Sequence, residues 1–290
     1  MNNVLIQKFN SKIEAHLYNY YWKQLGLFDW EKRIEERKNE IERCKTILES
    51  LELISGIHLK NKQFLDIGCG WGGFLTTAAI KGANVIGCDI DSEVIKIAEL
   101  RLKLHSLSGK IFLSPAEKLP FEDKSFDIIF CISVIEHVND VGKTIREISR
   151  VLKDDGIAWI QAPNYWAPIE PHYKIIFPPK CPKLLAKIWL KMIGRPVKFI
   201  DSINYTDPTL INKECLKNGL YIYNINKVPK KKYKPKINNI KYKKTLRYLY
   251  FVGLNIFTNY FVKIWEKVFK IERINYIVSH SNLKILNNKI

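Results

Sequence analysis

The sequence lacks the cysteine and histidine spacings that mark metal-binding or disulfide-stabilised proteins. Its six cysteines include no C-x-x-C pair, and its six histidines are scattered along 290 residues. We therefore expect no metal site, and the unpaired thiols predict a reducing, cytoplasmic compartment. Four of the cysteines lie in apolar or glycine-rich surroundings, where free buried thiols are usual: Cys69, Cys88, Cys131 and Cys181.

Long apolar runs and a leader-like N-terminus are also missing. No stretch reaches the roughly 18 uncharged apolar residues that predict a membrane-spanning helix. The closest, Tyr248–Val262, has fifteen residues and is interrupted by polar side chains. The first residues show no basic region followed by an apolar run, so we expect no signal peptide. A composition that is 47% hydrophobic and 12% aromatic instead predicts a sizeable packed core.

Acidic side chains are scarce in the C-terminal part of the chain. Residues 161–290 hold 25 basic and 6 acidic side chains, whereas residues 61–160 hold 12 and 14, so the net charge of +18 belongs to the C-terminal part. Ten Lys or Arg residues fall within residues 227–247, and an aromatic and aliphatic stretch follows. We favour the interpretation that residues 227–270 bind the anionic surface of the inner leaflet of a membrane. A solvated tail is the alternative, and nucleic acid is least favoured because no recognised module is present.

From residue 62 onward, short apolar runs alternate with helical patterns. The apolar runs read QFLDI, NVIGCDI, KIFLS, FDIIFCIS and GIAWIQAP. Five strands alternating with helices predict an α/β fold with a Rossmann-like, doubly wound, mostly parallel sheet. In such a fold the binding crevice lies outside the carboxyl ends of the strands.

Two flanking regions are predicted around this alternation. Residues 1–60 form an N-terminal helical extension, because Glu31–Leu53 mixes opposite charges with apolar residues at helical spacing and Gly56 supplies a stop. Residues 228–290 form a basic, aromatic C-terminal appendage.

The α/β domain itself is predicted over residues 61–227, with one insertion. Residues 163–202 hold seven prolines and break the alternation, so we expect them to form a lid above the crevice. Asp207-Pro208 then predicts the cap and first turn of a helix, and residues 220–227 predict a strand that returns to the sheet.

Residues 66–73 read DIGCGWGG, in which Gly68-x-Gly70-x-x-Gly73 matches the G-x-G-x-x-G loop of nucleotide-binding sites. Glycines permit the tight turn and let a ligand approach the main chain. Asp89 ends the second predicted strand 21 residues after Gly68, where a carboxylate can accept hydrogen bonds from both hydroxyls of a ribose. These features alone fit either a dinucleotide or another ribose-containing cofactor.

Asp66 separates the two kinds of cofactor. A dinucleotide would place its pyrophosphate at this loop, and a carboxylate about 4 Å away would oppose it by about 4 kcal/mol at an effective dielectric near 20. S-adenosylmethionine has no phosphate and carries an ammonium and a sulfonium, so a nearby carboxylate helps. Asp66 therefore favours S-adenosylmethionine.

Several motifs in order carry a resemblance to a known family. The run FLDIGCGWGGFL…VIGCDID…SPAEKLPFEDKSFDIIFCISVIEHV…REISRVLKDDGIAWIQAPN resembles the class I S-adenosylmethionine-dependent methyltransferases, in the branch of ubiquinone-pathway and sugar-modifying enzymes. It covers about residues 62–165, with a weaker likeness through INYTDPTLINKECLKNGLYI. The resemblance implies methyl transfer, which we expect to go to an oxygen of a small-molecule, glycan-type, lipid-like or lipid-linked acceptor.

The resemblance also implies which residues bind the cofactor. They are Asp66, Gly68, Cys69 and Gly70 in the glycine loop, Asp89 at the ribose hydroxyls, Ile90 on an adenine face, Ala116 and Glu117 at the adenine edge, and Ile132 and Ser133 at the methionine end. The sequence departs from the family at Pro115, where an aspartate is common. Proline supplies neither a carboxylate nor an N–H, which leaves the details of adenine recognition open.

Three residues are candidates for catalysis. Glu136 and His137 follow the fourth strand, where the family places residues that face the reacting methyl group. His137 could be a general base, since an ordinary imidazole pKa near 6.5 suits that work, or it could orient the loop. His172, in the insertion, could contact the acceptor or be an ordinary surface histidine.

Two rival functions stay open at this stage. An NAD-dependent oxidoreductase or epimerase would use the same glycine loop and Asp89, but it leaves Asp66 unexplained. A non-enzymatic, membrane-associated protein could keep a relic of the methyltransferase fold, although Asp66, Asp89 and the glycines are all present.

Overall fold

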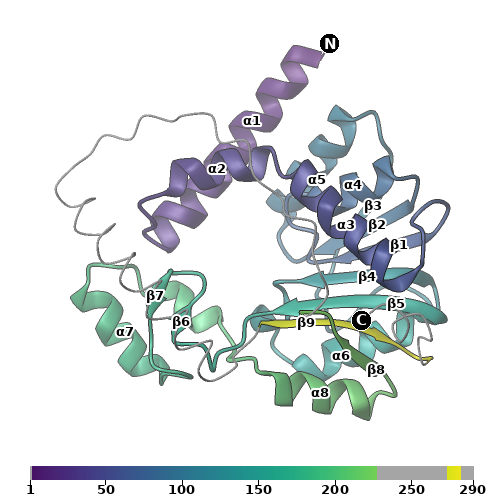
Figure 1. Ribbon diagram of the computed structural model, residues 1–290. Helices are drawn as coiled ribbons and strands as arrows, with labels where there is room; N and C mark the ends of the chain where they lie inside the picture. Colours follow the sequence, from purple (N-terminus) through teal and green to yellow (C-terminus); the bar gives the residue numbers. More distant parts are fainter. Residues whose placement is uncertain (1, 227–272, 282–290) are drawn as a thin grey trace.

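The computed structural model describes residues 2–226 and 273–281 (Figure 1). The chain begins with α1 (Asn2–Tyr18), a π-helical segment η1 (Asn19–Gln24), α2 (Trp30–Lys38) and α3 (Ile41–Ser55). Gly56 ends α3 with a φ of 72°, as its predicted role as a stop requires.

The helix predicted over Glu31–Leu53 is in fact two helices that break at Asn39. In a continuous helix, the carbonyls of Arg37 and Lys38 would accept hydrogen bonds from the next turn. Here both carbonyls accept from the guanidinium of Arg101, at 2.9 and 3.3 Å, and Asn39 folds its own amide back onto the carbonyl of Glu35. A long-range contact therefore overrides a helical pattern that continues through the break.

The sheet has seven strands in the order β3-β2-β1-β4-β5-β9-β8. The five strands predicted from the apolar runs pair in parallel: β1 (Gln63–Ile67), β2 (Asn84–Asp89), β3 (Lys110–Leu113), β4 (Phe126–Ile132) and β5 (Leu152–Ala162). Six of the seven residues of β4 are buried, because helices cover both faces of the sheet, and this explains why the central strands read as continuous apolar runs. The predicted Rossmann-like, mostly parallel fold is confirmed.

Helices cover the two faces of the sheet in separate layers (Figure 1). On one face, α3 packs with α4 (Gly73–Ile80) and α5 (Ser92–Leu104), and on the other lie α6 (Val141–Val151) and α8 (Pro208–Lys217). The side-chain oxygens of Asp91 and Asp207 cap the N-termini of α5 and α8, and the second cap is the one predicted from Asp207-Pro208.

One strand comes from a region that the sequence assigned to the C-terminal appendage. β9 (Ile274–Ser279) lies between β5 and β8 (Tyr221–Asn224) and is antiparallel to both. All six of its residues are buried, so an apolar strand late in the chain completes the sheet that was expected to end by residue 227. The basic segment predicted over residues 227–270 lies outside the described residues.

The insertion after β5 forms a small unit beside the sheet. It contains the hairpin β6 (Ile169–Glu170) and β7 (Ile175–Ile176), the helix α7 (Lys183–Met192) and the 3-10 helix η3 (Lys198–Ser202). Its apolar side chains share a hydrophobic cluster with α1, η1 and α2, so the insertion and the N-terminal helices pack on each other. No helix among the described residues is long and apolar enough to span a bilayer.

Candidate functional site

A cavity of about 1520 Å³ opens at the carboxyl ends of the parallel strands. The glycine loop, the ends of β2 and β4, the insertion and the N-terminal helices all contribute to its lining. Nine of the ten residues predicted to bind the cofactor line this one cavity: Gly68, Cys69, Gly70, Asp89, Ile90, Ala116, Glu117, Ile132 and Ser133. The fold thus brings together residues from four separate parts of the sequence.

The glycine loop turns sharply between β1 and α4. Gly68, Gly70 and Gly72 all have positive φ, a backbone region that favours glycine. Gly68 is also constrained by space, because a Cβ there would lie 2.4 Å from Cγ2 of Val134. The loop therefore needs a glycine at this position both for its backbone angle and for its packing.

Asp89 lies against the glycine loop at the end of β2. One of its carboxylate oxygens accepts a hydrogen bond from the backbone N–H of Gly70 at 3.0 Å, and the other accepts from Asp91 at the same distance. Burial raises the pKa of Asp89, although these N–H groups act to lower it. The carboxylate is thus fixed in place at the wall of the cavity.

Asp66 is the one predicted cofactor residue that does not line the cavity. It is 3% exposed. Its carboxyl accepts a hydrogen bond from the backbone N–H of Leu75, in the first turn of α4. Burial, followed by the nearby charges of Asp89 and Glu40, raises the pKa of Asp66 well above its usual range. Asp66 therefore ties the loop to α4, and its raised pKa weakens the negative charge on which the expected attraction to a cationic ligand depends.

A buried arginine that the sequence interpretation missed supports the same loop from behind. Arg101 is 1% exposed and donates to the carbonyl of Trp71, in the glycine loop, at 2.7 Å. Its guanidinium also forms an ion pair with Glu40 at 3.3 Å, besides its bonds to the end of α2. The sequence could have indicated that Arg101 is buried, because at helical spacing it continues the apolar stripe of α5 formed by Val94 and Ala98.

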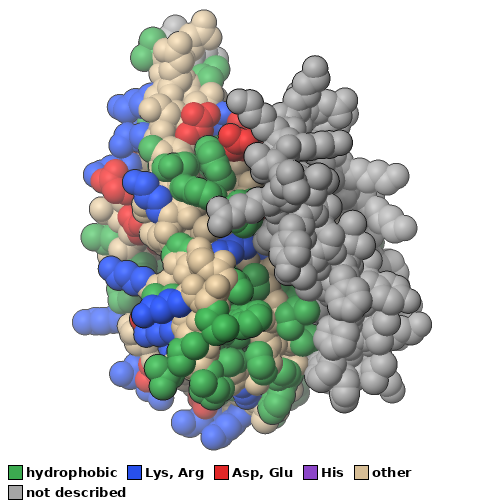
Figure 2. Space-filling view, turned by 90° about the vertical axis from the view of Figure 1, so that its left-hand side faces the viewer, with side chains coloured by type: hydrophobic (Ala, Val, Ile, Leu, Met, Phe, Trp, Pro, Cys, Tyr) green, Lys and Arg blue, Asp and Glu red, His purple; other side chains and the backbone are tan. Residues whose placement is uncertain are grey.

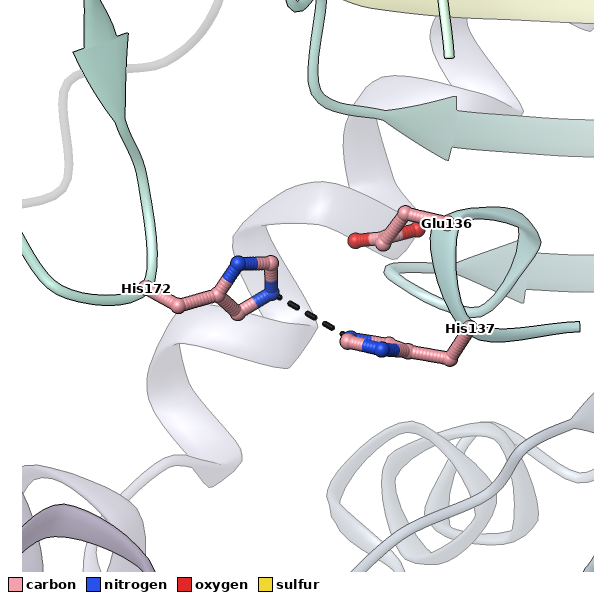
Figure 3. Close-up of side chains that lie close together, drawn as sticks. All are labelled: Glu136, His137 and His172. Carbon is pink, nitrogen blue, oxygen red and sulfur yellow. Dashed lines mark hydrogen bonds between the residues drawn. The ribbon is translucent and has the colours of Figure 1, made fainter. Parts of the chain in front are cut away.

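The three catalytic candidates lie together at the cavity wall (Figure 3). Glu136 and His137 belong to the 3-10 helix η2 (Ile135–His137) after β4, and His172 reaches them from the insertion. The Nε2 atoms of the two histidines lie 3.2 Å apart. Nδ1 of His137 faces the carbonyl of Ser202 at 3.4 Å. Two loops that are distant in the sequence thus share one cluster of acid–base groups.

Glu170 orients His172, a role that no pattern in the sequence indicates. Its buried carboxylate accepts the backbone N–H groups of His172 and Tyr173 at 2.8 and 2.6 Å, and Nδ1 of His172 lies 2.8 Å from the other oxygen. A carboxylate in this position fixes the Nδ1 proton on His172 and leaves its Nε2 directed at His137. The three side chains form a chain from Glu170 through His172 to His137.

Burial favours the uncharged forms of Glu136 and His137. Desolvation raises the pKa of Glu136 to about 7, against the lowering effect of His172, and one of its oxygens has no hydrogen-bond partner among the described residues. Desolvation and then the neighbouring His172 lower the pKa of His137 to about 4, so this imidazole is neutral at pH 7. Glu136 can therefore accept a proton near neutral pH, whereas His137 is a weaker base than the ordinary imidazole on which its expected general-base role rested.

The same cluster has the donor set of a metal site. One ligand atom from each of Glu136, His137 and His172 lies within 4.8 Å of the others, which is close enough for all three to hold one divalent cation. The expectation of no metal site rested on spacing along the chain. The structure joins ligands that are 35 residues apart, and spacing along the chain cannot show this.

Comparisons with known proteins find similarity to methyltransferases over part of the chain. Residues 65–160 match a family model described as a methyltransferase domain. The chain is 38% identical to a ubiquinone biosynthesis O-methyltransferase of Pelagibacter ubique over 107 residues, which cover 37% of this chain and 44% of that protein. It is 33% identical to a sterol 4-C-methyltransferase of Caenorhabditis elegans over 136 residues, which cover 45% of this chain and 39% of that protein. The chain thus spans less than half the length of these two relatives.

A solved structure shows the same fold over a larger share of the chain. It is a proposed sarcosine dimethylglycine methyltransferase from Galdieria sulphuraria, with 20% sequence identity and a TM-score of 0.50. The match covers 72% of this chain and 76% of that one. At this identity the likeness concerns the fold.

Proposed function

We propose that the chain is a class I S-adenosylmethionine-dependent methyltransferase, built around the methyltransferase domain matched over residues 65–160, and that it transfers the methyl group to an oxygen of a small acceptor. The observation that carries this proposal is the convergence of nine predicted cofactor residues and three acid–base groups on one cavity. Methyl transfer needs both, since the donor must be held in line with an oxygen that loses its proton.

Asp89 would hold the cofactor by accepting hydrogen bonds from its two ribose hydroxyls. The bonds from Gly70 and Asp91 fix the carboxylate before any ligand arrives, so little ordering is lost on binding. Gly68 and Gly70 would let the methionine moiety approach the main chain, with Cys69, Ile132 and Ser133 beside it. Ile90, Ala116 and Glu117 would enclose the adenine.

The acid–base cluster would take the proton of the acceptor hydroxyl. The sulfonium is already a good electrophile, so alignment of donor and acceptor supplies much of the rate, and removal of a hydroxyl proton supplies the rest. The carboxylate of Glu136 and the neutral imidazole of His137 are the proton acceptors on the cavity wall. Glu170 would keep His172 positioned against His137.

The proton-acceptor role can be separated from a metal-binding role. Glu170→Gln should lower kcat about tenfold or more while leaving the affinity for S-adenosylhomocysteine unchanged, because the bonds it alters, to His172, Tyr173 and Tyr165, all lie within the insertion. Treatment with EDTA should leave the wild-type rate unchanged. If EDTA abolished activity and Zn²⁺ or Mg²⁺ restored it, the cluster would be a metal site and the proton-acceptor role would be wrong.

The acceptor is proposed to be lipid-like or lipid-linked, with a glycan-type acceptor as the alternative. Relatives named for ubiquinone biosynthesis and for sterol methylation support a lipid-like class. The basic composition of residues 227–247 supports a peripheral position on the cytoplasmic face of a membrane, where such an acceptor would be found. A screen of cell extracts with methyl-labelled S-adenosylmethionine tests this, since label in an organic-extractable product is expected and label confined to water-soluble glycans would contradict it.

A further inference from the structure

Helix α7 presents apolar side chains to solvent on the face opposite to its buried face. Ala186 and Leu190 are fully buried and fix the inward face. At 3.6 residues per turn, the large apolar residues that remain lie together on the outward face, where a helix of a globular protein normally carries polar residues. They are 45–74% exposed: Leu184, Leu185, Ile188, Trp189 and Met192.

A row of lysines borders this outward face. Lys183, Lys187 and Lys191 recur every four residues and so form one stripe along α7. Between Glu170 and Asp201 the sequence contains seven Lys and Arg residues and no Asp or Glu. Figure 2 looks onto this side of the molecule and shows hydrophobic side chains gathered with Lys and Arg at their margins.

The same helix is tied to the wall of the cavity. Nζ of Lys187 lies 2.6 Å from a carboxylate oxygen of Asp201, and Nζ of Lys183 donates to the Asp201 carbonyl at 2.9 Å. Asp201 belongs to η3, whose residues Lys198 and Phe199 line the cavity. The outward face of α7 is therefore coupled to the site through a single short helix.

We propose that the outward face of α7 docks on the surface of an anionic lipid bilayer. Its apolar side chains would enter the boundary between headgroups and acyl chains, where the Trp189 ring is well suited, and the lysine stripe would contact anionic headgroups. The docking proposal rests on the proposed methyl transfer to a lipid-like acceptor. Docking through α7 would bring the cavity next to the lipid phase that holds such an acceptor.

The positive charge beside the outward face of α7 argues against two other partners, a second copy of this chain and a segment of the chain itself. In a symmetric dimer the face would meet its own copy, and the stripe of Lys183, Lys187 and Lys191 would oppose a second such stripe, with only Lys187 offset by an acid among the described residues, Asp201. A segment of this chain from residues 227–247 would bring ten further positive charges. An anionic surface is the partner whose chemistry complements both the apolar residues and the lysines.

A fluorophore placed on α7 tests the proposal directly. All six native cysteines are buried, so a Met192→Cys variant of the full chain can be labelled with an environment-sensitive probe. Leu216→Cys on α8, at a residue that is 68% exposed, gives a matched control. With vesicles of phosphatidylcholine and phosphatidylglycerol, the Met192 probe should shift to the blue and be quenched by a lipid-borne spin label. The Leu216 probe should do neither, and pure phosphatidylcholine should give a much weaker response.

A charge variant gives the corresponding binding measurement. Leu185→Glu with Met192→Glu should lower partitioning onto the anionic vesicles at least about tenfold, since the apolar insertion is lost. Leu216→Glu should leave partitioning unchanged. Calorimetry with S-adenosylhomocysteine on the same variants should show unchanged affinity, so a failure of the methyltransferase proposal would be seen separately.

Three outcomes would overturn the docking surface. The chain could sediment with vesicles while the Met192 probe stays silent, which would place binding on another segment. The Met192 probe could shift with protein concentration when no vesicles are present, which would make the face a contact between copies. The double glutamate variant could partition as well as the wild type, which would remove the face from membrane binding.

Discussion

The carboxylate of Asp89 accepts a hydrogen bond from the backbone N–H of Gly70, across 3.0 Å, and so joins the end of β2 to the glycine loop that follows β1. The other carboxylate oxygen is held by Asp91, at the N-terminus of α5. Two neighbouring strands thereby place a fixed hydrogen-bond acceptor beside the glycine loop at one edge of the sheet. This geometry suits a ribose with two hydroxyls, and it is the part of the site on which the cofactor proposal depends.

Replacement of Asp89 should weaken cofactor binding more than it weakens the fold. Asp89→Ala removes both proposed ribose contacts, and hydrogen bonds to a charged acceptor are each worth about 1.5–3 kcal/mol, so S-adenosylhomocysteine affinity should fall at least about tenfold. Calorimetry measures this. Glu93→Ala, at an exposed carboxylate of the following helix, is the control and should keep full affinity. An Asp89→Ala protein with wild-type affinity would remove Asp89 from the ribose site.

Substitution of Gly68 should reveal the packing of the glycine loop. Gly68→Ala incurs strain from a φ of 64° and places a methyl group 2.4 Å from Val134. Gly194→Ala, at a φ of 70° with no atom within 4 Å of the added Cβ, incurs the backbone strain alone. We expect Gly68→Ala to lower the free energy of unfolding by about 1–3 kcal/mol more than Gly194→Ala does, as denaturant titration can measure. Equal losses in the free energy of unfolding would show that the Val134 side chain moves aside with no energetic penalty.

Loss of the buried Arg101 should destabilise the chain and loosen the glycine loop. Arg101→Met leaves the carbonyls of Trp71, Arg37 and Lys38 without their donor and removes one partner of Glu40. Breaking a buried ion pair in this way typically costs about 3–5 kcal/mol. Urea unfolding should show that loss, with Arg101→Lys intermediate, and S-adenosylhomocysteine binding should weaken in parallel. A stable Arg101→Met protein with normal binding would exclude a supporting role.

The rate of methyl transfer should rise with pH through the titration of Glu136. Burial raises the pKa of this carboxyl to about 7, so its proton-accepting form is scarce at pH 6 and predominates at pH 8. The pH profile of kcat should therefore rise across neutrality, and Glu136→Gln should lower kcat and abolish the rise. Glu122→Gln, at an exposed position, should keep the wild-type profile. A rise that persists in Glu136→Gln would assign the titration to another group.

Local patterns in the sequence predict much of the fold. Each of the first five strands contains a short apolar run, which is most fully buried in β4, and the caps Asp91 and Asp207 directly precede the helices that they cap. The glycine loop is likewise indicated locally, because glycine is the residue that most readily adopts the positive φ found at positions 68 and 70. Interactions between neighbours in the sequence are sufficient for these predictions.

Features that depend on distant residues could not be predicted in the same way. β9 is a plain apolar strand, but its place between β5 and β8 depends on pairing with residues more than a hundred positions away. The break at Asn39 depends on Arg101, and the orientation of His172 toward His137 depends on how the insertion packs. Asp66 shows the same limit, since the sequence indicates a carboxylate in the loop but not that it lies beneath it.

The most direct test of the account is isothermal titration calorimetry of the full chain with S-adenosylhomocysteine and with NAD. We predict one S-adenosylhomocysteine bound per chain with a dissociation constant in the micromolar range or below, and no heat of binding with NAD. Tight NAD binding together with no response to S-adenosylhomocysteine would contradict the central claim and would assign the glycine loop and Asp89 to a dinucleotide.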